Sequence, residues 1–69
     1  MEARRLTEMA NQIAGFFDAY PEEQAVTATA DHLRQFWDPR MRAQLKEAVA
    51  TGEDLDISPT VLSAIRRIG

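Results

Sequence analysis

The chain has 69 residues and a net charge of −3 at neutral pH, with 8 basic and 11 acidic residues. This length excludes two separate hydrophobic cores, so we expect a single domain over residues 1–69. The spacing of its apolar residues, described below, predicts that this domain is helical. The chain contains no cysteine and a single histidine, which excludes disulfides, thiolate metal sites and a zinc site built within one chain. We therefore expect regular helix packing, self-association or a partner protein to stabilise it.

Apolar residues at helical spacing predict a first helix that ends at Tyr20, because the residue before Pro21 disfavours the helical conformation. We expect its apolar stripe, including Ile13, to face the core. The stripe consists of Leu6, Met9, Ala10, Ile13, Phe16, Phe17 and Tyr20.

The second helix is predicted from Glu22 to Phe36. Glu22 and Glu23 occupy its first turn, where the helix dipole favours negative charge. Its apolar stripe consists of Val26, Ala30, Leu33 and Trp37, flanked by Thr29 and Phe36.

Two turns that contain proline open the remaining helices. Asp38 and Ser58 are good N-cap residues, and the proline after each suits the first helical position. The third helix should end at Thr51-Gly52, with Gly52 as a left-handed cap. An acidic loop at residues 53–56 then leads to a short final helix. The sequence thus predicts an all-α fold: a small bundle of three main helices plus a short C-terminal helix. The apolar stripes of the last two helices are Met41, Leu45, Ala48 and Val49, then Val61, Leu62, Ile65 and Ile68.

No group of residues in the sequence indicates catalysis. Ser58 and Ser63 have no histidine nearby, and the adjacent carboxylates at residues 22–23 and 53–54 do not converge. The sequence contains no glycine-rich phosphate loop. We predict no catalytic, cofactor-binding or metal-binding residue. No apolar run reaches the roughly 20 residues of a membrane span or forms the core of a secretion signal, so we expect no membrane contact. The absence of cysteine is compatible with the cytoplasm.

Residues 31–46, which we call the elbow, are the most distinctive segment. The elbow has a net charge of +2, whereas the rest of the chain has −5. Tryptophan, methionine and arginine are enriched at protein interfaces, so the elbow is a candidate docking surface. A solvated basic face is an equally good interpretation of its arginines. Trp37 lies on a helix stripe, which favours a mainly core position. His32 lies at the edge of the apolar face, one turn before Phe36, which favours an ordinary edge position. The candidate partner-binding residues are His32, Arg34, Phe36, Trp37, Asp38, Arg40 and Arg42.

A small nucleic-acid-binding or regulatory protein is the alternative from another class. The second and third helices, joined by a tight turn, are similar to a helix-turn-helix. Arg40, Arg42, Gln44 and Lys46 could read a duplex from the third helix. The isoelectric point near 4.9 and the lack of a basic arm argue against this function.

Two segments of the chain carry a recognisable pattern. The first is Met-Ala-Asn-Gln-Ile-Ala-Gly-Phe-Phe at residues 9–17. The second is Asp-His-Leu-Arg-Gln-Phe-Trp-Asp-Pro-Arg-Met-Arg at residues 31–42. Both resemble the delta subunit of bacterial NAD-dependent formate dehydrogenase of the molybdenum-containing, multisubunit, cytoplasmic type. The resemblance covers roughly residues 6–50, and amphipathicity alone does not require the Phe-Trp-Asp-Pro-Arg-Met run.

The resemblance implies a non-catalytic accessory subunit that aids assembly, stability or cofactor loading. Formate oxidation would take place at a molybdopterin cofactor in the alpha subunit, and electrons would pass through iron–sulfur clusters to flavin and NAD on other subunits. The implied partners are these larger subunits, the alpha subunit first among them. The lack of cysteine agrees with this, because the chain has no ligands for an iron–sulfur cluster of its own.

Overall fold

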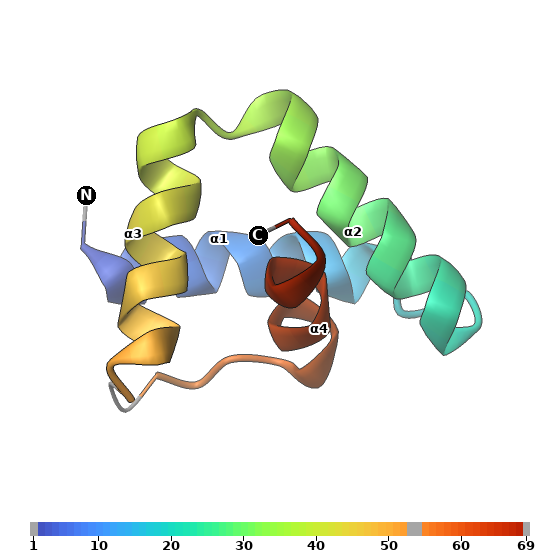
Figure 1. Ribbon diagram of the computed structural model, residues 1–69. Helices are drawn as coiled ribbons and strands as arrows, with labels where there is room; N and C mark the ends of the chain where they lie inside the picture. The colour runs from blue at the N-terminus through green and yellow to red at the C-terminus, as the bar shows by residue number, and fades with distance from the viewer. Residues whose placement is uncertain (1, 53–54, 69) are drawn as a thin grey trace.

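The computed structural model describes residues 2–52 and 55–68. Over these residues the chain forms four helices and no strand (Figure 1). The predicted all-α fold with a shorter final helix is confirmed. Two residues of the predicted acidic loop, Glu53 and Asp54, lie outside the described residues. The helices are α1 (Ala3–Phe17), α2 (Glu22–Phe36), α3 (Pro39–Ala50) and α4 (Pro59–Arg67).

The N-termini of α3 and α4 are capped as their sequences predict. The Asp38 carboxylate accepts a hydrogen bond from the backbone N–H of Met41 at 2.9 Å. The Ser58 hydroxyl accepts one from the N–H of Val61 at 3.2 Å. The proline after each cap has no N–H to leave unpaired in the first turn. Side-chain chemistry therefore fixes where both helices begin.

The helix ends agree with the sequence except at α1. α2 has the predicted bounds, and Gly52 after α3 has a φ of 76°, the left-handed conformation of a cap. The prediction that the first helix continues to Tyr20 is wrong, because α1 ends at Phe17. Residues 18–20 form a turn in which the Tyr20 N–H donates to the Phe17 carbonyl at 3.0 Å. The chain needs these residues to reverse direction, so that α2 can pack against α1.

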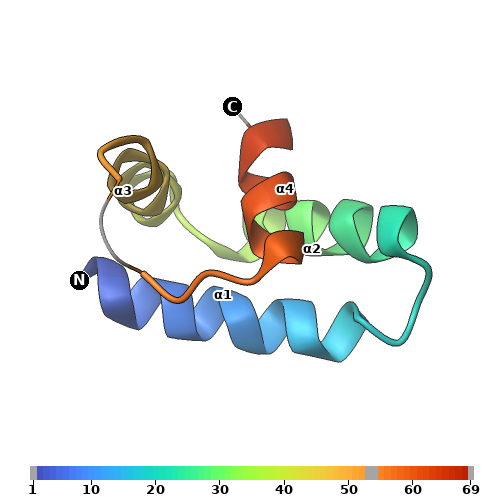
Figure 2. The same ribbon diagram turned by 90° about the horizontal axis from the view of Figure 1, so that it is seen from below.

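α1 packs against each of the other three helices, and α4 packs mainly against α2 (Figures 1 and 2). In Figure 2 the segment before α4 runs along α1. Asn11 holds it there: its amide nitrogen donates to the Asp56 carbonyl at 2.6 Å, and its amide oxygen accepts from the Ser58 N–H at 3.0 Å. One polar side chain of α1 thus positions the start of α4.

All four helices and Trp37, in the turn between α2 and α3, contribute to the main core cluster. The predicted second-helix stripe is confirmed, since its four residues are buried. Trp37 is 5% exposed, as expected of a mainly core residue. The cluster consists of Leu6, Ala10, Ala14, Leu33, Trp37, Leu45, Val61 and Ile65.

The predicted stripe of the first helix is partly wrong. Leu6 and Ala10 are buried, but Phe16 is 75% exposed and Tyr20 is 55% exposed. Ile13 is only partly buried against the cluster. The buried face of α1 turns instead toward its small residues, because alanine side chains let neighbouring helices approach closely. Leu6 stays buried, whereas Phe16 is left exposed at the side of the helix.

Candidate partner-binding site

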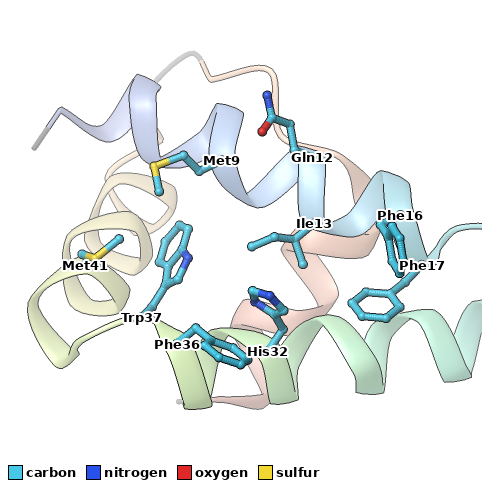
Figure 3. Close-up of a pocket in the computed structure, with 9 residues that line it drawn as sticks. All are labelled: Met9, Gln12, Ile13, Phe16, Phe17, His32, Phe36, Trp37 and Met41. Atoms are coloured by element: carbon cyan, nitrogen blue, oxygen red, sulfur yellow. The ribbon is translucent and has the colours of Figure 1, made fainter.

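An apolar groove opens beside the core, between α1, α2 and the beginning of α3 (Figure 3). Its volume is about 630 Å³, and no Asp, Glu, Lys or Arg lines it. Polar side-chain atoms come only from Gln12, His32 and the indole of Trp37. We refer to this feature as the groove. Its lining consists of Met9, Gln12, Ile13, Phe16, Phe17, His32, Phe36, Trp37 and Met41.

α1 forms one wall of the groove. Its five lining residues, at positions 9, 12, 13, 16 and 17, recur at helical spacing and therefore share one side of the helix. This side lies next to the buried side that contains Ala10 and Ala14. The Phe16 and Phe17 rings meet edge to face, with centroids 5.2 Å apart. Because Phe16 is 75% exposed, this contact leaves most of its ring in water.

α2 forms the opposite wall, with His32 and Phe36 one turn apart. Their ring centroids are 4.6 Å apart, and Phe36 is 70% exposed. The Nδ1 atom of His32 is buried and has no hydrogen-bond partner among the described residues. The imidazole ring of His32 therefore contributes mainly a packing contact with the phenyl ring of Phe36. His32 lies at the edge of the core, as the sequence predicts.

Trp37 and Met41 close the groove where α2 meets α3 (Figure 3). The indole belongs to the core cluster and to the groove at once. Met41 is partly buried against the same cluster. A methionine side chain is unbranched and flexible, so it can adapt its shape to an incoming group.

The structure separates the predicted partner-binding residues. His32, Phe36 and Trp37 line the groove. Asp38 does not, because its carboxylate caps α3. Arg34 joins two helices: its guanidinium pairs with Asp31 at 3.0 Å and donates to the backbone carbonyl of Arg67 at 3.3 Å. In this structure Arg34 is therefore occupied by contacts within the chain.

The two arginines of α3 also lie outside the groove lining. Arg40 is exposed, whereas Arg42 is partly buried. Arg42 lines a separate hollow of about 310 Å³ together with Lys46 and Ile68. Its Nε atom is buried without a hydrogen-bond partner among the described residues. The elbow thus contributes apolar residues to the groove and basic residues to a different surface.

Sequence reasoning did not identify the α1 wall of the groove as a binding surface. One signal was present: the apolar stripe of the first helix is too wide for one buried face. It contains Leu6 and Ala10 on one side and Met9 and Phe16 on another, and the structure buries only the first pair fully. The α1 residues that line the groove are Met9, Gln12, Ile13, Phe16 and Phe17.

The model of one protein family, described as the NADH-dependent formate dehydrogenase delta subunit FdsD, matches residues 5–65. The chain belongs to this family. The match includes the α1 wall and the whole elbow, and it confirms the resemblance found in residues 9–17 and 31–42. As a delta subunit, the chain associates with other subunits of formate dehydrogenase. The comparisons with curated proteins and with solved structures gave no match.

Two further properties concern the described part of this delta subunit. Its longest helices have 15 residues, and none of its helices qualifies as a membrane-spanning segment. Within residues 2–52 and 55–68, no three His, Cys, Asp or Glu residues gather in a way that could hold a metal ion.

Proposed function

We propose that this delta subunit is a non-catalytic accessory subunit that binds a larger subunit of formate dehydrogenase through the groove. The observation that supports this most strongly is the exposure of Phe16 and Phe36, at 75% and 70%, on opposite walls of an uncharged groove. Contiguous exposed apolar surface in a folded protein marks an interaction site. Burial of this surface against a partner would supply about 25 cal/mol for each Å² removed from water.

The proposed first partner is the alpha subunit, which would contain the molybdopterin cofactor. Iron–sulfur clusters and flavin would likewise belong to other subunits. The delta subunit would aid assembly, stability or cofactor loading of the enzyme in the cytoplasm. Its composition supports this role, because it has no cysteine and only one histidine as ligands for such groups.

Arg40 and Arg42 are proposed as a second, electrostatic contact outside the groove. Neither forms an ion pair with another described residue. An arginine side chain can form forked hydrogen bonds to a carboxylate, so the matching surface of the partner should be acidic. Arg34 contributes less to this contact, because Asp31 and the Arg67 carbonyl already engage it.

Copurification tests the proposal. An affinity-tagged delta subunit, produced together with the other formate dehydrogenase subunits, should retain a larger subunit through gentle washing. The same chain produced alone should oxidise no formate and contain no stoichiometric molybdenum, iron or flavin. Formate turnover by the chain alone would contradict the non-catalytic role. Failure to retain any larger subunit would contradict the binding role.

A further inference from the structure

We infer that the groove binds an amphipathic α-helix of a larger formate dehydrogenase subunit, and that this helix inserts neutral apolar side chains between Phe16 and Phe36. The inference rests on the proposed function and adds the secondary structure and chemistry of the bound segment. Three properties of the groove support it: its shortage of hydrogen-bonding groups, its shape and its lack of charge.

The shortage of hydrogen-bonding groups favours a helix over an extended segment. Each residue of an extended segment brings a backbone N–H and a C=O that need partners. The groove offers only the side chains of Gln12, His32 and Trp37, and the Nδ1 atom of His32 is buried. An extended segment would lose water from its backbone without replacing those hydrogen bonds. A helix pairs its backbone internally and can present apolar side chains alone.

The shape of the groove matches the repeat of a helix. In Figure 3, α1 and α2 flank the groove on opposite sides, and α3 lies at its Met41 end. The α1 wall extends from residue 9 to residue 17, which corresponds to about 12 Å at 1.5 Å per residue. A bound helix places side chains at i, i+3 or i+4 and i+7 along a similar length. Two or three such anchors can therefore lie side by side in the groove.

The absence of charge selects neutral anchors. Charged residues make up 28% of the chain, yet none lines the groove. A charged side chain that entered would lose water and gain no counter-ion. Met9 and Met41 add flexible walls that can adapt to branched or aromatic groups. We therefore expect leucine, isoleucine, methionine or phenylalanine on the face that the partner helix inserts.

Photocrosslinking within the assembled complex tests this inference. The photoreactive amino acid p-benzoylphenylalanine replaces Phe16 in one variant and Phe36 in a second, so that each probe preserves an aromatic ring in the groove. A third variant has the probe at Gln24, an exposed α2 residue that does not line the groove. Mass spectrometry then identifies the crosslinked residues of the larger subunit.

We expect both groove probes to crosslink to one helical segment of the larger subunit, at residues three, four or seven positions apart. The Gln24 probe should give little or no crosslinking to that segment. Crosslinks to alternate residues of an extended segment, or to a second copy of this chain, would overturn the inference. So would crosslinking from the groove that is no stronger than from Gln24 in a complex that still copurifies. In these cases the association itself stands, whereas failure of the unmodified subunit to copurify with any larger subunit would contradict the proposed function.

Discussion

Two sides of α1 differ in which of their apolar side chains are buried. The core side buries Leu6 and the methyl groups of Ala10 and Ala14, each with no exposed surface. The groove side contains larger residues, yet Phe16 is 75% exposed. A free protein that used its apolar area for its own stability would bury the rings and expose the methyl groups. The proposed function would account for this difference, because the exposed ring of Phe16 would be buried against the partner subunit.

The energetic consequence concerns the free subunit. Full burial of a phenylalanine side chain is worth roughly 1.5–3 kcal/mol. Phe16 and Phe36 obtain little of this stabilisation alone, because the two residues are 75% and 70% exposed to water. Binding of a partner to the folded form would supply it and would raise the apparent stability of the subunit. The core side should therefore govern folding, and the groove side association.

The largest expected effects come from replacing one residue that belongs to the core alone and one that belongs to both the core and the groove. Leu33 is fully buried, and Trp37 belongs to both the core and the groove. Trp37→Ala should lower the free energy of unfolding by about 3–5 kcal/mol, and Leu33→Ala by about 2–5 kcal/mol. Urea unfolding monitored by circular dichroism measures both. If either variant had the same free energy of unfolding as the parent, the core would be wrongly assigned.

The same pair also sharpens the comparison in binding. Provided that enough of each variant is folded, Trp37→Ala should weaken association beyond its folding defect, because its ring closes one end of the groove. Leu33→Ala should bind in proportion to its folded fraction. Equal binding by the folded fractions of both variants would exclude a direct role for the indole.

A smaller effect is expected on the basic surface of the elbow. Arg40→Ala and Arg42→Ala together should change the free energy of unfolding by only about 0–1 kcal/mol, because charges near the surface contribute little to stability. The double variant should bind the larger subunit more weakly than the parent does. Added salt should weaken binding of the parent more than binding of the double variant, since salt screens ion pairs. Copurification at increasing salt concentration measures this. Identical salt dependence of the two proteins would mean that these arginines form only a solvated face.

The fold follows from the sequence because its signals are local. Asp38 and Ser58, each followed by proline, fix two helix starts through hydrogen bonds within one turn. The α2 stripe also follows, because Val26, Ala30 and Leu33 face one direction. The predicted end of the first helix failed at Tyr20, since the length of the turn depends on how α2 packs against α1.

The groove could be predicted only in part, because burial depends on tertiary packing. Spacing placed Phe16 among the apolar residues of the first helix but could not show which side of that helix faces α2 and α4. The elbow was recognised from its residue types, and His32, Phe36 and Trp37 do line the groove. The engagement of Arg34 by the Arg67 carbonyl joins residues 33 positions apart, which no local pattern reveals.

The most direct test of the central claim is the affinity of the groove variant for the larger subunit, with an exposed aromatic residue outside the groove as control. Phe16→Ala combined with Phe36→Ala should leave folding nearly unchanged. It should weaken binding by 2 kcal/mol or more, roughly 30-fold, as expected for aromatic anchors at the centre of an interface. Tyr20→Ala, which removes a ring that is 55% exposed but does not line the groove, should bind like the parent. Equal affinities of the parent and both variants would show that the groove is not the binding surface.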